Sequence, residues 1–541
     1  MITFSKLIFT LGKMNSVNEK IEALAEYFKH ADEKDKIWAI VLLSGKAPSK
    51  KVKSSELKKW CIEFTKTPLW LFEESYQHVG DLAETIALLL PNSEFIECKV
   101  RVSLASLLEK MYHDDLKTET NRKTFIINYW KQLDKQSCFV FNKLLTGGFR
   151  IGISKSLLIK SIAKAENMPI DEVAYRLTGE INPLTEQYHI LLDKNHISNI
   201  SKPYPFHLCY PLDFDLSALQ NAENWIAEWK WDGIRGQCIK RNNQHFIWSR
   251  GENLITENIP EFEQFLSQLP DGTVIDGEIL CAIPEADKFI PLPFSLLQTR
   301  INRKTISKKN MQQAPLVFIA YDLMEDRGYD IRNQPLIERK KVLYELVTRT
   351  QNIHLQFSTI IPIQKWDELF QIREKSRENL SEGLMLKNKM SLYLSGRKKG
   401  DWWKWKMDPL TIDCVLIYAQ KGHGRRSNLY TDYTFAVKDG DKLITFTKAY
   451  SGLTDEEFKE VDQFIKKNAI EKFGPVRTVK PELVFEIAFE GISESKRHKS
   501  GIALRFPRMK RIRRDKTPNE INTLNDLRKM LEIYQSHSST P

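Results

Sequence analysis

Apolar residues in the first part of the chain recur at every third or fourth position, which is the period of an amphipathic helix. The pattern is clear over residues 21–28 and again over residues 69–79, and strand-like alternation is scarce there. Residues 1–16 fit the first turns of such a helix, because Lys6 and Lys13 break the apolar run and no signal-peptide cleavage site follows. The pattern therefore predicts an all-helical amino-terminal region.

The helical period is lost between residues 182 and 212, where several prolines indicate a first domain boundary. Residues 225–407 then mix strand-like segments with helix, which predicts an α+β region. Its predicted elements include strands at residues 246–248, 274–275 and 317–319 and a helix over residues 338–347.

After Pro409 short strands dominate, as expected for a small β-barrel. They are predicted at residues 412–418, 433–437, 443–447 and 483–487, with a helix over 455–467. A chain of 541 residues exceeds what one core can fill, so about three domains are expected. We predict a multidomain protein with an all-α domain (1–205), an α+β domain (206–408) and a β-barrel domain (409–541). The polar tail, residues 535–541, is expected to fray.

Lysine and arginine outnumber aspartate and glutamate by 81 to 70, a formal net charge of +11. This excess favours polyanionic partners, nucleic acid above all, although anionic membranes also attract cations. The best candidate for a membrane span, residues 86–90, is far too short and ends at Pro91, so no membrane partner is expected. The seven cysteines are scattered without a C-x-x-C pair, which fits a reducing compartment, and we expect a cytoplasmic protein.

Two features of the helical region could contact phosphates. A glycine-rich stretch at residues 147–152 leads into Ser154, Lys155 and Lys160, and backbone N–H groups at a helix start can hold a phosphate. Lysines also gather at positions 46, 50, 51, 53, 58 and 59. An ordinary helix–helix turn and a solvated basic face explain the same residues as well, so both interpretations stay open.

Residues 228–235 carry the most informative pattern, K-x-D-G-x-R with a carboxylate two residues before the lysine. A lysine is a nucleophile only when neutral, so we expect the site to lower the pKa of Lys230 by burial or by nearby cations. Gly233 permits a tight backbone, and Arg235 offers a planar fork for phosphate or ribose oxygens. This motif alone is weak evidence, because a solvated surface turn that contains Lys and Asp can have the same short sequence.

Further motifs follow in order downstream. They are Ser249-Arg250-Gly251, Asp276-Gly277-Glu278, Tyr321-Asp322-Leu323, Glu382-Gly383, the alternating Trp402–Lys406, Arg505-Phe506-Pro507-Arg508 and Arg513-Arg514-Asp515-Lys516. The ordered set resembles the covalent nucleotidyltransferases, the superfamily of DNA ligases, RNA ligases and mRNA capping enzymes. The two arginine-rich motifs near the carboxyl end are most similar to those of ATP-dependent DNA ligases, including the compact bacterial subtype. NAD-dependent ligases are disfavoured, because the cysteines do not form a zinc module.

The resemblance implies a helical DNA-binding domain, an α+β nucleotidyltransferase domain of the ATP-grasp-like ligase adenylation type, and an OB-fold barrel. It implies that Lys230 attacks the α-phosphate of ATP and holds AMP. Glu228 would accept a hydrogen bond from the adenine amino group, while Arg235 and Arg250 would bind ribose and phosphate oxygens. Tyr321 stands where the family usually has phenylalanine and would stack on adenine, with plain core packing as the alternative.

Glu278 and Glu382 are the implied ligands of Mg²⁺, with Mn²⁺ as a substitute, since hard cations prefer oxygen ligands. A strand-end salt bridge is the alternative for Glu278. Lys404 and Lys406 alternate with tryptophans on a predicted strand, which puts both lysines on one face. There they would touch the α-phosphate and help to lower the pKa of Lys230.

Arg513, Asp515 and Lys516 fall in the predicted barrel. The resemblance implies that they orient the leaving pyrophosphate when the barrel closes over the nucleotide, whereas a basic surface tail is the alternative. The implied partner is nicked duplex DNA, gripped by a monomeric clamp with joints near Pro203 and residues 408–409. An RNA ligase, a capping enzyme and an inactive nucleic-acid clamp stay as alternatives, although the intact set of lysines and carboxylates argues against a decayed site.

Overall fold

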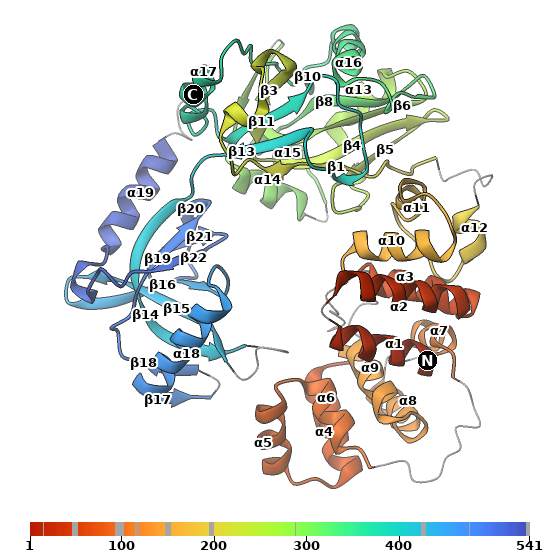
Figure 1. Ribbon diagram of the computed structural model, residues 1–541, viewed down its shortest axis with the longest axis vertical. Coiled ribbons are helices and arrows are strands. Elements are labelled where there is room, and N and C mark those ends of the chain that lie inside the picture. The colour runs from red at the N-terminus through yellow and green to blue at the C-terminus, as the bar shows by residue number, and fades with distance from the viewer. Residues whose placement is uncertain are drawn as a thin grey trace.

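The computed structural model describes the chain except residues 15, 46–51, 92–101, 114–115, 117, 147–152, 194–199, 287, 304, 423–428, 475 and 537–541. A helical region, a middle region with two large sheets and a barrel region follow one another around an open C (Figure 1). The glycine-rich stretch, three of the clustered lysines (Lys46, Lys50 and Lys51) and most of the polar tail lie outside the described residues.

The amino-terminal region is helical, as predicted. Its helices are α1 (Ile2–Lys13), α2 (Val17–His30), α3 (Glu33–Leu43), α4 (Ser54–Thr65), α5 (Leu69–Val79), α6 (Leu82–Leu89), α7 (Leu104–His113), α8 (Glu119–Gln132), α9 (Lys135–Thr146), α10 (Lys155–Ala165), α11 (Ile170–Arg176) and α12 (Tyr188–Leu192). They share one apolar core that includes the fully buried Trp38, Trp60 and Phe141.

Helix α5 occupies the residues predicted for it, but only part of its apolar stripe faces this core. Phe72 is fully buried, whereas Leu69 is 58% exposed and Tyr76 is 38% exposed. Among the basic residues, Lys58 forms an ion pair with Glu73 on α5. Ser154 caps α10 by accepting from the backbone N of Leu157 at 3.2 Å.

The middle region mixes strands with helices, as predicted. Its strands are β1 (His207–Leu208), β2 (Tyr210–Pro211), β3 (Trp225–Trp231), β4 (Ile234–Arg241), β5 (Gln244–Ser249), β6 (Thr273–Pro284), β7 (Phe289–Pro291), β8 (Leu316–Asp326), β9 (Tyr329–Asp330), β10 (Leu355–Phe357), β11 (Ser381–Asn388), β12 (Gly396–Arg397) and β13 (Trp402–Lys406). Its α-helices are α13 (Glu263–Gln268), α14 (Phe294–Ile301), α15 (Lys308–Gln313), α16 (Leu336–Thr350) and α17 (Trp366–Glu374). Single-turn helices are η1 (Leu216–Leu219), η2 (Ala222–Asn224), η3 (Thr256–Asn258) and η4 (Pro260–Phe262).

Two sheets of this region position the site. One has the strand order β10-β8-β6-β4-β5 and the other the order β2-β13-β11-β3. Strands β3 and β4 are consecutive in the chain but belong to different sheets, so the short turn between them passes from one sheet to the other. Residues on β3 and β4 are thereby brought close to both sheets.

The barrel region carries the strands β14 (Leu410–Lys421), β15 (Tyr430–Asp439), β16 (Lys442–Ala449), β17 (Ala469–Phe473), β18 (Val476–Val479), β19 (Val484–Phe489), β20 (Gly491–Glu494), β21 (Ile502–Arg505) and β22 (Arg508–Ile512), with α18 (Asp455–Asn468), η6 (Pro518–Glu520) and α19 (Leu524–Ser536). All but β20 and β21 belong to one seven-stranded sheet. Helix α19 runs from the barrel toward the middle region and continues into the first residues of the tail that we expected to fray (Figure 1).

The segment that leads from the helical region into the middle region is packed down. Pro203 is buried, and Gln237 on β4 exchanges two hydrogen bonds of 2.8 Å with the backbone of Tyr204. Trp248 on β5 donates from its indole N–H to the carbonyl of Ser201 at 2.6 Å. Ser201 and Tyr204, on either side of Pro203, are thus both hydrogen-bonded to the larger sheet in this arrangement, and the joint near Pro203 stays a prediction.

Candidate active site

Lys230 lies near the end of β3, two residues before the turn into β4. At Gly233 in this turn an added Cβ would lie 2.4 Å from the carbonyl oxygen of Ile279 and 2.7 Å from Cγ of Glu278 on β6. The glycine of the motif is thus required by the close approach of β6, as its place in K-x-D-G predicts. It allows Lys230 and Glu278, from different sheets, to lie near each other.

We expect Gly233→Ala to shift this turn, with a stability loss of about 1–3 kcal/mol from overpacking and, if Lys230 carries AMP as the resemblance implies, a fall of at least about tenfold in adduct formation. AMP-adduct formation and thermal melting measure the two effects. Gly12→Ala is the matched control, because its Cβ would meet nothing within 4 Å and the position is helical. A Gly233→Ala variant with the wild-type adduct rate would contradict the requirement.

The Lys230 ammonium forms an ion pair with Glu382 on β11. Glu382 also lies 3.3 Å from Nζ of Lys406 on β13, so two lysines share one carboxylate. Burial lowers the pKa of Lys230, but Glu382 and then Glu278 more than offset burial, and the pKa stands above its ordinary value. The expected lowering of this pKa is therefore wrong for the present arrangement, because strand pairing brings a carboxylate closer to Lys230 than any cation.

Lys404 behaves as the alternation on β13 predicts. Trp403 and Trp405 are buried, while Lys404 and Lys406 are half-buried on the other face. Burial, and then the nearby cations Lys230 and Lys406, lower the pKa of Lys404 despite an opposing contribution from Cys209. The face next to Lys230 therefore carries positive charge suited to a phosphate.

Glu228 is buried on β3 between two lysines. Its Oε1 lies 2.5 Å from Nζ of Lys340 on α16, and its Oε2 lies 2.7 Å from Nζ of Lys387 on β11. Burial opposes ionisation, but the two lysines together lower the pKa of Glu228 to about 2. The carboxylate is thus ionised at neutral pH and can only accept hydrogen bonds.

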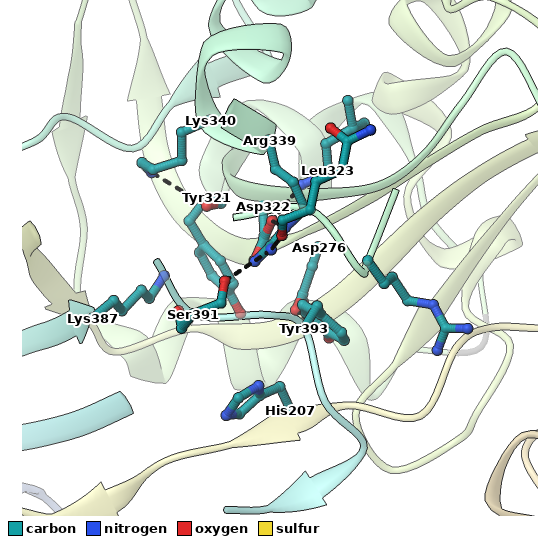
Figure 2. A network of polar contacts seen from close by, with 12 residues as sticks. His207, Asp276, Tyr321, Asp322, Leu323, Arg339, Lys340, Lys387, Ser391 and Tyr393 are labelled. Carbon is teal, nitrogen blue, oxygen red and sulfur yellow. Dashed lines mark hydrogen bonds and ion pairs between the residues drawn. The ribbon is translucent and has the colours of Figure 1, made fainter. Parts of the chain in front are cut away.

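The guanidinium of Arg235 on β4 is committed to protein partners. It lies 2.6 Å from Oδ2 of the fully buried Asp276 on β6 and donates to the carbonyl of His207 at 2.7 Å. Tyr393 donates to the same Asp276 oxygen at 2.7 Å. Figure 2 shows Asp276, Tyr393 and His207 close together in this network. Arg235 therefore holds neighbouring residues of the site in place. The motif alone does not indicate this structural role.

Glu278 and Tyr321 are half-buried on β6 and β8, in the sheet that faces Lys230. Burial raises the pKa of Glu278 to about 7, although Lys230 and Arg235 pull it down. The ring centroid of Tyr321 lies 4.3 Å from Nζ of Lys387 and 5.6 Å from the guanidinium carbon of Arg235. The half-buried ring of Tyr321 thus lies close to two cations in the sheet that also carries Glu278.

Arg250 is exposed in the loop after β5, and its backbone N donates to the carbonyl of Arg235 at 2.8 Å. The same loop meets the helical region, since Glu252 forms an ion pair with Lys155 at the start of α10. The structure thus connects the start of α10, one of the two candidate phosphate contacts, to the Arg250 loop.

The carboxyl-terminal motif divides into two parts. Arg513 lies 3.0 Å from Asp413 on β14, and Lys516 lies 2.6 Å from the same carboxylate. Arg513 also pairs with Asp515 at 2.7 Å. Among the described residues, the structure therefore places these three with Asp413 of the barrel and does not bring them to Lys230.

The earlier part of this motif does reach the site. Arg505 on β21 forms a bidentate ion pair with Asp232, two residues after Lys230, with one contact of 3.0 Å from Nη2 to Oδ1. Its guanidinium carbon also lies 4.2 Å from the ring centroid of Phe294. The barrel is therefore joined to the turn of the K-x-D-G motif itself.

Glu278 and Glu382, the predicted ligands of Mg²⁺, are the carboxylates that act on the Lys230 ammonium. In the part of the chain that the structure describes, no group of three or more His, Cys, Asp or Glu side chains could hold a metal ion. Two carboxylates beside a phosphate site suit Mg²⁺, which is held by one or two carboxylates, several waters and substrate phosphates.

Comparisons with known proteins agree with this architecture. Family descriptions match the chain as DNA ligase N terminus (residues 3–163), ATP dependent DNA ligase domain (209–406) and ATP dependent DNA ligase C terminal region (426–516). A probable DNA ligase of Koribacter versatilis is 35% identical over 419 residues, 73% of this chain and 71% of the relative. DNA ligase 1 of Korarchaeum cryptofilum is 29% identical over 421 residues, 76% of this chain and 75% of the relative.

A solved structure named Pmar-Lig_Pre. shares the fold, with a TM-score of 0.62 and 16% identity over 94% of this chain and 99% of that chain. Fold and site together define a nucleotidyltransferase. The chain belongs to the ATP-dependent DNA ligase family and is an enzyme that forms phosphodiester bonds in DNA. The predicted resemblance is thus confirmed, and an RNA-joining or capping function is not favoured.

Proposed function

We propose that Lys230 is the nucleophile that attacks the α-phosphate of ATP and carries AMP as a phosphoramide. The AMP then passes to the 5′-phosphate at a nick in duplex DNA, and the 3′-hydroxyl attacks that phosphate and releases AMP. The observation that carries the proposal is the half-buried Lys230 beside Glu382 and Glu278, with Lys406 paired to the same Glu382 from β13 on the far side of β11. Incubation with labelled ATP and Mg²⁺, followed by a denaturing gel, tests for the covalent adduct.

Different residues around Lys230 bind different parts of the nucleotide. Glu228 accepts from the adenine amino group, and Tyr321 offers its ring to the base. Arg235 shapes the pocket through Asp276, and the exposed Arg250 binds ribose or phosphate oxygens. Lys404 and Lys406 hold the α-phosphate, where negative charge spreads as pyrophosphate leaves.

Attack by Lys230 requires that its proton be removed. In the present arrangement Glu382 stabilises the ammonium form, so attack needs this ion pair to loosen. Glu278 and Glu382 would hold Mg²⁺, which when bound neutralises charge on the triphosphate and competes for the carboxylate oxygens. Lys406 and Lys404 then face Lys230 as like charges, which favour its neutral form.

The three regions fit a monomeric clamp for nicked duplex DNA. We assign residues 1–205 to a helical DNA-binding domain, 206–408 to the adenylation domain and 409–541 to an OB-fold domain. Support comes from the open C of Figure 1 and from the basic net charge of +11. No helix among the described residues is long and apolar enough to cross a membrane. Since its substrates are ATP and DNA, we expect the enzyme in the cytoplasm.

A variant that begins at Ser201 should keep self-adenylation and lose most nick sealing. The variant keeps residues 201–212 because they pack against the two sheets of the adenylation domain and help to hold that domain together. Lost phosphate contacts should flatten the salt dependence of DNA binding, by a log–log slope of about 0.9 for each contact. Filter binding across a salt series measures this. A slope equal to that of the full chain would mean that the helical region does not hold DNA.

A further inference from the structure

The two groups assigned to adenine are tied together by one buried lysine that belongs to none of the sequence motifs. Lys340 on α16 is 2% exposed and lies 2.5 Å from Oε1 of Glu228. Its ammonium also donates to the backbone carbonyl of Tyr321 at 3.2 Å, a contact visible in Figure 2. The Lys340 ammonium therefore holds both residues that we assign to adenine. It contacts the side chain of Glu228 and the backbone of Tyr321.

Lys387 holds the other oxygen of Glu228 and lies 4.3 Å from the centroid of the Tyr321 ring. Oε1 accepts a hydrogen bond from Lys340, whereas Oε2 pairs with Lys387 by charge and has no hydrogen-bond partner among the described residues, so it can accept from a base. The pair of lysines thus fixes the direction of the remaining lone pairs. The carboxylate stays ionised at neutral pH, since the lysines lower the pKa of Glu228 to about 2.

An ionised carboxylate held in this way distinguishes adenine from guanine. Adenine carries an amino donor at C6, whereas guanine carries an oxygen acceptor at that position. The ionised Glu228, which can only accept hydrogen bonds, would bind the amino group of adenine and repel the oxygen of guanine. Without Lys340 the carboxylate could turn away from the base or take up a proton, and a protonated carboxyl could donate to the guanine oxygen.

We propose that Lys340 is a positioning residue for the nucleobase, which acts through Glu228 and the Tyr321 backbone to make the ligase select ATP over GTP. This inference rests on the proposed contact between Glu228 and adenine. Lys340 does not touch the reacting atoms, so its effect belongs to nucleotide binding and not to the later chemistry on DNA.

Lys340→Met tests the inference. Removal of one lysine leaves Glu228 paired with Lys387, so the buried carboxylate keeps a counter-ion and the fold should persist. We expect the KM for ATP in adduct formation to rise about tenfold or more, as for loss of a charge-assisted hydrogen bond. The preference for ATP over GTP should fall by a similar factor. Sealing of a pre-adenylated nick should stay within about twofold of the wild type.

The matched control is Lys341→Met, next along α16 but exposed, which should change neither selectivity nor KM. A second readout uses a purine nucleoside triphosphate that lacks the 6-amino group. The wild type should bind this analogue about tenfold more weakly than ATP, whereas Lys340→Met should treat the two almost alike. A purely structural role for Lys340 would weaken both nucleotides equally and leave their ratio unchanged.

The outcomes separate the inference from the proposed function. If the wild type itself fails to distinguish ATP from the amino-free analogue, the contact between Glu228 and adenine is wrong. If the wild type distinguishes them and a natively melting Lys340→Met does so equally well, only the role of Lys340 is overturned. Should the methionine variant not fold, Lys340→Arg, which keeps the charge but moves the donors, must show an altered ATP-to-analogue ratio, and an unchanged ratio overturns the inference.

Discussion

Lys230→Ala should form no AMP adduct with labelled ATP and should seal no nick when ATP is the only source of AMP. We expect a loss of at least about 10⁴-fold, because removal of a nucleophile abolishes the covalent step that later steps need. The chain offers other lysines close by, but Lys404 and Lys406 lie on β13, which β11 separates from β3, so neither occupies the position of Lys230. Adduct formation on a denaturing gel is the measurement.

The same variant should still join a nick that already carries AMP, because that step does not use Lys230 as nucleophile. The alanine substitution should not unfold the site. Glu382 loses one partner but keeps Lys406 at 3.3 Å, so this carboxylate is not left unpaired. Persistent labelling of the variant would show that another residue is the nucleophile. A melting temperature well below that of the wild type would assign the loss to folding instead.

The sequence predicted the parts of the site that local spacing determines. Alternation alone placed Lys404 and Lys406 on one face of a strand, and the structure has them there with Trp403 and Trp405 buried behind. The tight turn at Gly233 was likewise implied by the motif. Such features depend on neighbours within a few residues, which a pattern can report.

The sequence could not predict contacts that depend on strand register and helix packing. Lys340 meets Glu228 across 112 positions of the chain, and Arg235 meets Asp276 across 41. Each of these two contacts joins elements that only the packing of the complete domain brings together. Lys340 sits in an ordinary amphipathic helix, and its only signal was a lysine at a position that the helical period assigns to the buried face.

The direction of the pKa shift of Lys230 could not be predicted from the sequence either. Nearby lysines were visible in the sequence and suggested a lowered pKa. The sign depends on which charge is nearest, and the pairing of β11 with β3 brings Glu382 closest. A motif gives the types of charge at a site, whereas the fold sets their distances.

Asp515→Ala should slow self-adenylation by ATP at least about a hundredfold and leave the sealing of pre-adenylated nicks largely intact. Our proposal is that Arg513, Asp515 and Lys516 align pyrophosphate as a leaving group, and pyrophosphate leaves only in the first step. Misalignment of a leaving group costs several kcal/mol of near-attack geometry, which accounts for such a factor. In the present arrangement Arg513 is held by Asp413 and Asp515, so the barrel must move to bring this motif to Lys230.

Asp515 is the cleaner choice within the motif because its side chain is 63% exposed, and an exposed ion pair adds little to stability. Arg513 is only 13% exposed and shares the nearly buried Asp413 with Lys516, so its removal would disturb the barrel more. Arg514→Ala is the matched control, since Arg514 pairs with the exposed Glu460 and should affect neither step. If a natively melting Asp515→Ala variant formed the AMP adduct at the wild-type rate but sealed pre-adenylated nicks more slowly, the motif would contact DNA and its assignment to pyrophosphate would be wrong.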